Sequence, residues 1–186
     1  MHVGASPFWT SPLDCLQGGP PGIFIEGHRL YVFVGLGQNP GHMGCLWTRI
    51  DDLTHFTTCT SNPIISGAPE YGPLEARGFA ANPYYDFRFV TSADIVWSDG
   101  YYYMTYEGIR GPSSPTVGRD DQFALGFARS PDLDAVWEKY PGNPMLSDVG
   151  DYWGIGHADL VIDGRYTYLY TQTPYGTRGR YTLVLK

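Results

Sequence analysis

Short runs of alternating apolar and polar residues recur along the chain, and each pair of runs is joined by a Gly-containing turn. Residues 92–106 read SADIVWSDGYYYMTY and residues 157–171 read HADLVIDGRYTYLYT, and a weaker copy, PGIFIEGHRLYVFVG, occupies residues 21–35. A period of two is the pattern of a strand, and Asp-Gly or Glu-Gly between two such runs indicates a tight hairpin. Each copy therefore predicts a β-hairpin, with Asp99 and Asp163 in the turns.

The repeat continues beyond the first two hairpins. Residues 44–66, GCLWTRIDDLTHFTTCTSNPIIS, and residues 124–147, ALGFARSPDLDAVWEKYPGNPMLS, share a strand, an Asp-Leu turn, an aromatic residue and a closing Asn-Pro-apolar-apolar-Ser. Each unit thus predicts four short strands. The last copy ends in GRYTLVLK, residues 179–186, which predicts a third strand.

Four-stranded units with recurring Gly and aromatic residues are typical of the blades of a β-propeller. We therefore predict an all-β fold in a single domain, with blade-like repeats at about 20–66, 91–147 and 154–186 and an insertion at 67–90; an ordinary β-sandwich is the alternative. Since propellers have about four to eight blades, three cannot close a ring. Either the chain is part of a longer protein, or partner chains close the ring, or one blade is too divergent to identify.

Composition narrows the classes of function. The chain is 16% aromatic and 17% charged, with 24 Gly and 15 Pro, which suits a tightly turning β protein. The net charge of −7 argues against a nucleic-acid partner, and the sequence shows neither a membrane-spanning stretch nor a signal peptide. Cys45 and Cys59 could form a disulfide, but buried free thiols are an equal alternative.

The blade sequences resemble those of the five-bladed β-propeller glycosidases, the superfamily of glycoside hydrolase families 43, 32, 62 and 68, of which the chain would be a partial or divergent member. The resemblance is carried by ARSPDLDAVWEKYPGNPML and by GIGHADLVIDGRYTYLYT, which is similar to the Gly-x-Gly-His hairpin of the family's fourth blade. It implies a carbohydrate ligand in an axial pocket and an extracellular or periplasmic protein. It also implies that His157 faces the channel, where it binds substrate or helps to hold Ca²⁺; no other cofactor is expected.

Glycosidases of this superfamily use carboxylates around the axial pocket to protonate the leaving oxygen and to attack or activate water. These acids stand near the start of the innermost strand, where the first repeat reads GGPPG and has none. Asp94 and Asp159 lie in matching places of the other two repeats, and Glu107 ends the next strand in TYEGIRG. We predict these three acids as catalytic candidates; the alternative for each Asp is a turn cap that accepts backbone N–H groups.

The insertion that precedes the second repeat carries further candidates, because binding residues concentrate on loops of a rigid scaffold. Those predicted to bind substrate, in addition to His157, are Glu75, Arg77, Tyr85, Arg88 and Trp153. Two functions remain open at this point. One is a glycoside hydrolase acting on a polysaccharide or oligosaccharide, and the other is a non-catalytic propeller that binds carbohydrate or serves as a structural surface module.

Overall fold

The structure is a computed structural model that describes residues 20–36, 41–67, 85–86, 88–109, 123–146, 155–172 and 180–185. These residues form twelve strands and no helix, so none of them belongs to a helix that could cross a bilayer. The strands are β1 (Gly22–Glu26), β2 (Arg29–Leu36), β3 (His42–Arg49), β4 (Thr57–Thr58), β5 (Ile65–Ser66), β6 (Phe89–Ser98), β7 (Tyr101–Ile109), β8 (Phe123–Ser130), β9 (Glu138–Lys139), β10 (Gly156–Asp163), β11 (Tyr166–Gln172) and β12 (Arg180–Leu185).

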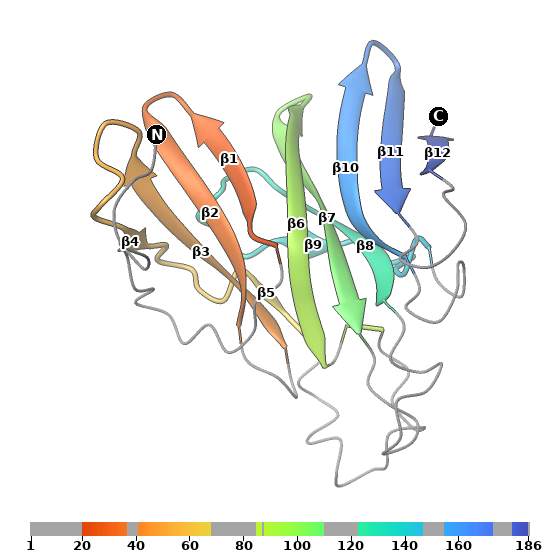
Figure 1. Cartoon of the computed structure of the whole chain (residues 1–186), viewed down its shortest axis with the longest axis horizontal. Coiled ribbons are helices and arrows are strands. Elements are labelled where there is room, and N and C mark those ends of the chain that lie inside the picture. The colour runs from red at the N-terminus through yellow and green to blue at the C-terminus, as the bar shows by residue number, and fades with distance from the viewer. Residues whose placement is uncertain are drawn as a thin grey trace, which may run out of the picture.

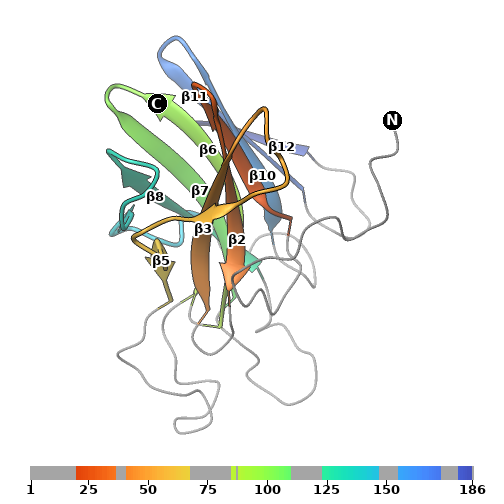
Figure 2. The same cartoon turned by 90° about the vertical axis from the view of Figure 1, so that its left-hand side faces the viewer.

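The strands make three antiparallel sheets, which stand side by side (Figure 1). Their orders are β1-β2-β3-β4, with β5 also on β3, then β6-β7-β8-β9, and β10-β11-β12. The first strand of the second sheet, β6, lies between β1 and β10, and a view turned by 90° shows the sheets one behind another (Figure 2). The predicted all-β fold with three blades is confirmed, and we call the sheets blades one, two and three.

The predicted hairpins are present, with one correction to their turns. In blade two the turn is Asp99-Gly100, both with positive φ, as predicted. In blade three, however, Asp163 is the last strand residue, paired with Tyr166, and the turn is Gly164-Arg165. The two hairpins have the same length, but the Asp-Gly pair stands one position earlier in blade three, so Gly164 takes at the first turn position the positive φ that Asp99 takes in blade two.

The Asn-Pro motif has the same structural role in both blades that contain it. The Asn62 side chain accepts from the Cys45 N–H and donates to its carbonyl, at 2.7 and 2.8 Å. Asn143 makes the same two bonds with Phe127, both at 2.9 Å. Each amide thereby fastens the end of its blade to the third strand, which explains why the motif recurs at corresponding places.

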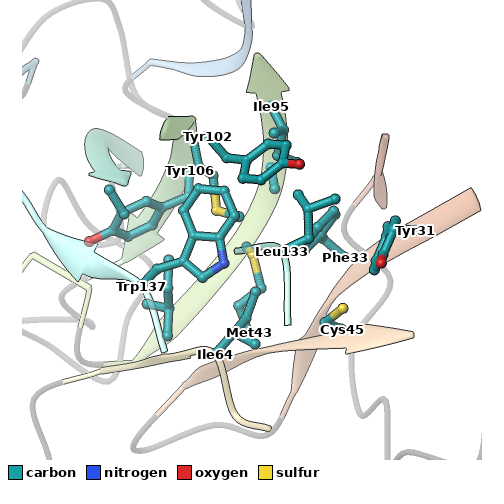
Figure 3. Packing of buried hydrophobic residues seen from close by; sticks show 14 of the residues in the cluster. Tyr31, Phe33, Met43, Cys45, Ile64, Ile95, Tyr102, Tyr106, Leu133 and Trp137 are labelled. Carbon is teal, nitrogen blue, oxygen red and sulfur yellow. The ribbon is translucent and has the colours of Figure 1, made fainter. Parts of the chain in front are cut away.

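The main core fills the space between blades one and two (Figure 3). Trp137 and Leu133, from the segment that joins β8 to β9, pack with Phe33 and Ile64 of blade one. Trp137 is a core residue, since only 3% of it is exposed. A disulfide joins Cys45 to Cys59 within the same core, which settles the choice between a disulfide and free thiols for this pair.

A second, smaller core lies between blades two and three. Leu125 of β8 packs there with Ile155, Ala158 and Leu160 around β10, and with Leu169 of β11. The two cores hold β6 and β10 side by side, and this packing sets the position of the site described next.

Candidate functional site

The inner strands of blades two and three carry the same irregularity. The pairing of β6 with β7 shifts by one residue between Thr91 and Asp94, and the pairing of β10 with β11 shifts in the same way between Gly156 and Asp159. A shift of this kind is a β-bulge, which bends the strand and re-aims its side chains, and bulges are frequent beside active sites.

Each bulge holds a residue in an unfavourable backbone conformation. Ser92 has a φ of 51° and His157 a φ of 48°, in the left-handed region that residues other than glycine adopt rarely. The two residues occupy corresponding positions of their blades, two places before Asp94 and Asp159. Strain of about 1–3 kcal/mol per residue persists only where the surrounding structure imposes it, and such residues cluster at functional sites.

Glu107 lies between the two bulges. It pairs with Thr91 across β6 and β7, and only 3% of it is exposed. Its Oε1 accepts a short hydrogen bond from the His157 backbone N–H and lies 3.7 Å from the Nδ1 of the same residue. We call the group formed by Ser92, Glu107, Gly156 and His157 the bulge site.

Burial controls the protonation of the bulge site. Removal of the Glu107 carboxyl from water raises its pKa, and this effect exceeds the opposing effects of the His157 N–H, the His157 charge and the nearby Ser92 hydroxyl. The Thr91 and Ser92 hydroxyls are buried, and neither forms a hydrogen bond of standard geometry. A carboxyl with a raised pKa thus lies beside polar groups that have capacity left for a ligand.

The raised pKa makes stability depend on pH. Between the ordinary pKa of a glutamate and the higher value of Glu107, the folded protein binds more protons than the unfolded chain, so stability falls as pH rises. In Glu107→Gln this contribution is absent. We expect the free energy of unfolding of the wild type, relative to that of Glu107→Gln, to decrease across this window, as measured by urea unfolding at a series of pH values.

The matched control for this measurement is Glu138→Gln, which removes an exposed carboxylate on β9. It should leave the slope against pH close to that of the wild type. Equal slopes for the wild type and Glu107→Gln would contradict a raised pKa at Glu107.

Gly156 permits the close approach of Glu107. A Cβ at this position would lie 2.8 Å from Oε1 and 3.1 Å from the carboxyl carbon of Glu107. We expect Gly156→Ala to lower the free energy of unfolding by about 1–3 kcal/mol, because both groups are fixed by the bulge and cannot separate freely. In a Glu107→Ala background the same change should cost much less, and a double-mutant cycle by chemical denaturation measures the difference. An equal cost in both backgrounds would show that the clash is not with Glu107.

Asp94 and Asp159 occupy corresponding places but different surroundings. The Asp94 Oδ2 accepts from the Leu160 N–H at 2.6 Å, so this carboxylate ties blade two to the inner strand of blade three. Burial raises the Asp94 pKa, and the charge of Asp159 raises it further, against the effect of the Leu160 bond. Asp159 itself is exposed on β10. In blade one the corresponding residue is Gly22, paired with Phe33 as Asp94 is with Thr105, so blade one has no acid at this place.

The structure therefore brings together four of the predicted residues, namely Asp94, Glu107, His157 and Asp159, around the junction of β6, β7 and β10. Glu75, Arg77 and Trp153 lie outside the described residues. Arg88 stands at the start of β6, where its N–H donates to the Ile109 carbonyl at 2.8 Å and its guanidinium lies 5.9 Å from the centre of the Phe89 ring.

Tyr85 packs within blade two. Its ring lies against Tyr106 with 5.9 Å between centroids and its hydroxyl is buried, and its role in substrate binding stays a prediction. Glycines at 108 and 126 leave room for this ring, since a Cβ at either position would contact it. Tyr85 is thus part of the packing of blade two.

The residues around His157 do not assemble a metal site within the described part of the chain. No group of three His, Cys, Asp or Glu side chains is placed there to hold an ion. The expected Ca²⁺ at His157 stays a prediction, and the chemistry below does not use it.

Sequence reasoning missed Ser92 and Gly156 as members of the site. The signal for Ser92 was its position in the repeat, which matches that of His157. Gly156 precedes the histidine in GIGH, and its requirement becomes apparent only once Glu107 is seen against it.

No protein-family model and no curated protein matches the sequence. The fold, in contrast, is similar to those of solved glycoside hydrolases. A family 117 enzyme from the marine bacterium Zobellia galactanivorans matches with a TM-score of 0.58 and 14% identity over 84% of this chain and 48% of its own. A thermostable family 43 enzyme matches with 0.57 and 15% over 89% and 45%, and a family 43 protein from Bacillus licheniformis with 0.55 and 18% over 97% and 30%.

The chain therefore spans 30–48% of the length of these structures. All of them are five-bladed β-propeller glycoside hydrolases. The resemblance to this superfamily that the blade sequences indicated is confirmed at the level of the fold.

Proposed function

We propose that the bulge site is part of a carbohydrate-active site of the glycosidase type, in which Glu107 is the proton donor. The observation that supports this most directly is a buried carboxyl with a raised pKa, held between two strained bulges on the inner strands. Cleavage of a glycosidic bond needs an acid that keeps its proton near neutral pH beside a second carboxylate that does not.

The second carboxylate must have a different environment from the first. Asp159 is exposed on β10, two residues beyond His157, and no bond of its carboxylate to another residue is described. Asp94 is half-buried and already accepts from Leu160, which suits a residue that positions β10. We assign Asp159 to the second carboxylate and Asp94 to positioning, while His157 orients Glu107 through its backbone N–H and binds substrate with its exposed ring.

The substrate that this proposal implies is an exposed plant or microbial polysaccharide or its oligosaccharides. An extracellular or periplasmic location is consistent with the disulfide between Cys45 and Cys59, because disulfides persist mainly in oxidising compartments. Further blades or partner chains would supply the remaining walls of the axial pocket.

A second candidate function is carbohydrate binding without catalysis. It is favoured by two observations at corresponding places, namely Gly22 in blade one, where no acid stands, and the Asp94 carboxylate, which is engaged by a backbone N–H. Under this function Glu107 would fix the bulges and take no part in a reaction.

One experiment separates the two functions. Wild type and Glu107→Gln are incubated with a panel of polysaccharides, and the release of reducing ends is measured together with binding by affinity electrophoresis. Hydrolysis by the wild type that Glu107→Gln loses, with binding retained, supports the proton-donor role. Binding by both proteins without hydrolysis supports the second function, and neither binding nor hydrolysis by the wild type would overturn both.

A further inference from the structure

Blades one and two present corresponding surfaces on the side that faces the next blade. One row of paired residues across blade one is Tyr31, Trp47 and Thr57. The corresponding row across blade two is Tyr103, Arg129 and Glu138. We call the first surface the covered socket, made by Tyr31, Phe33, Cys45, Cys59 and Ile64, and the second the open socket, made by Tyr103, Phe127, Tyr140 and Met145.

The backbone supports this correspondence residue by residue. The Cys59 N–H donates to the Cys45 carbonyl at 3.0 Å, and the Tyr140 N–H donates to the Phe127 carbonyl at 2.9 Å. The Asn62 side chain accepts from the N–H of this same Cys45, and the Asn143 side chain accepts from the N–H of Phe127. Ile64 and Met145 each follow an Asn-Pro pair by one position.

The covered socket is filled by a segment of blade two. Trp137 meets the Phe33 ring edge-on, with 6.2 Å between centroids, and the Trp137 backbone N–H donates to the Ile64 carbonyl at 2.8 Å. The Asp134 carboxylate accepts from the Ser61 N–H at 3.1 Å. Leu133 is 1% exposed beside them, and Figure 3 shows both apolar side chains among the residues of blade one. This segment has the pattern Leu-Asp-x-x-Trp.

In the open socket the corresponding residues remain accessible. Tyr31 and Cys59 are each 4% exposed, whereas Tyr140, which corresponds to Cys59, is 51% exposed, and Tyr103, Phe127 and Met145 are half-buried. These residues line a groove of about 460 Å³, together with Arg129 and Pro141. The inner part of the same face is closed by Ala158 and Leu160 of blade three. Blade three has three strands in its described part, and no described residue of it takes the place that Trp137 takes in the covered socket.

We propose that the open socket binds an extended segment of another polypeptide that carries the Leu-Asp-x-x-Trp pattern. Its leucine and tryptophan fill the groove between Phe127 and Met145, as Leu133 and Trp137 fill the covered socket. By the same correspondence the backbone N–H of its tryptophan donates to the Met145 carbonyl, and its Asp side chain accepts from the Gly142 N–H, the counterpart of the Ser61 N–H. The inference does not depend on the proposed reaction, since the socket and the bulge site share no residue.

The test uses the segment of this chain that fills the covered socket. A fluorescently labelled peptide with the sequence of residues 130–146, SPDLDAVWEKYPGNPML, is titrated with the whole protein, and binding is followed by fluorescence anisotropy. We expect saturable binding, weakened about tenfold or more in a control peptide that carries Leu133→Ala and Trp137→Ala, because buried tryptophans contribute most of the energy of such contacts.

Protein variants locate the bound peptide. Phe127→Lys places a charge in the groove and should abolish binding, and Tyr140→Asp, at an exposed position, should weaken it if Phe127→Lys does not fold. Tyr170→Lys, an exposed aromatic residue of blade three, is the matched control and should leave binding unchanged. The proposal is overturned if neither peptide binds or if both bind equally. It is also overturned if the socket variants bind the peptide as the wild type does, which would mean that the peptide exchanges with residues 130–146. Displacement of the peptide by an oligosaccharide would overturn it as well.

Discussion

Replacing Trp137 by Ala is expected to lower the free energy of unfolding by about 3–5 kcal/mol. Trp137 is 3% exposed and lies between blades one and two, where it contacts the Phe33 ring. Removal of the indole leaves a cavity in the largest core, and rigid strands on both sides prevent its collapse. Since the total stability of a domain is about 5–15 kcal/mol, much of the folded population would be lost. Urea unfolding monitored by circular dichroism measures the change.

Two further variants show whether packing is the cause. The Trp137 Nε1 is buried without a hydrogen-bond partner, so Trp137→Phe sacrifices no bond and should cost less than Trp137→Ala. Trp97→Ala removes an indole that is 51% exposed and should cost far less than either. If Trp97→Ala and Trp137→Ala destabilised the protein equally, the space between blades one and two would not be the main source of stability.

The sequence was sufficient to predict the fold because each repeat contains the local patterns that specify its own strands and turns. Period-two alternation and Gly turns specify the hairpins, and the Asn-Pro motifs specify where each outer segment returns to its third strand. The error at Asp163 arose where the Asp-Gly pair stands one position earlier in a hairpin of the same length, because a turn can place its positive φ on Asp99 or on Gly164 without altering the pattern of strands.

The site was predicted less completely, because its parts meet through contacts between blades. Asp94, Glu107, His157 and Asp159 were found from their places in the repeat. The role of Gly156 depends on the approach of Glu107 from another blade, which no pattern within one repeat encodes. The packing of Tyr85 against Tyr106 could not be predicted, because an aromatic residue in an insertion gives the same pattern whether it faces a ligand or packs against its own blade.

Repetition also explains why the site lies where it does. The same bulge occurs in blades two and three, so each inner strand carries one strained residue at the same position. The residue two places farther on is Asp94 or Asp159 in these blades. The corresponding residue of blade one is Gly22, where a Cβ would lie 2.3 Å from the Ala93 carbonyl oxygen. A repeated backbone thus presents unlike side chains to one region, which lets neighbouring carboxyl groups titrate differently.

The second large effect is expected in catalysis. On a glycoside with a poor leaving group, Glu107→Gln should reduce kcat/KM by about 10²–10⁴-fold, the usual contribution of a general acid. The glutamine keeps an oxygen that can accept the His157 N–H, so the bulge is preserved while the proton is removed. Because burial raises the pKa of Glu107, wild-type activity should persist above the ordinary range of a glutamate and then fall as the carboxyl ionises. Initial rates across pH measure both effects.

The leaving group distinguishes proton donation from a structural role. An aryl glycoside whose phenolate departs without protonation does not need the acid, so Glu107→Gln should retain much more of the wild-type rate on it, and the fall of activity at high pH should weaken. A residue that only maintained the fold would reduce the rates on both substrates by the same factor. Asp94→Asn is the matched control, because its amide oxygen can still accept the Leu160 N–H. It should lower both rates alike and leave the fall at high pH in place, and a loss confined to poor leaving groups in Asp94→Asn would move the proton donor from Glu107 to Asp94.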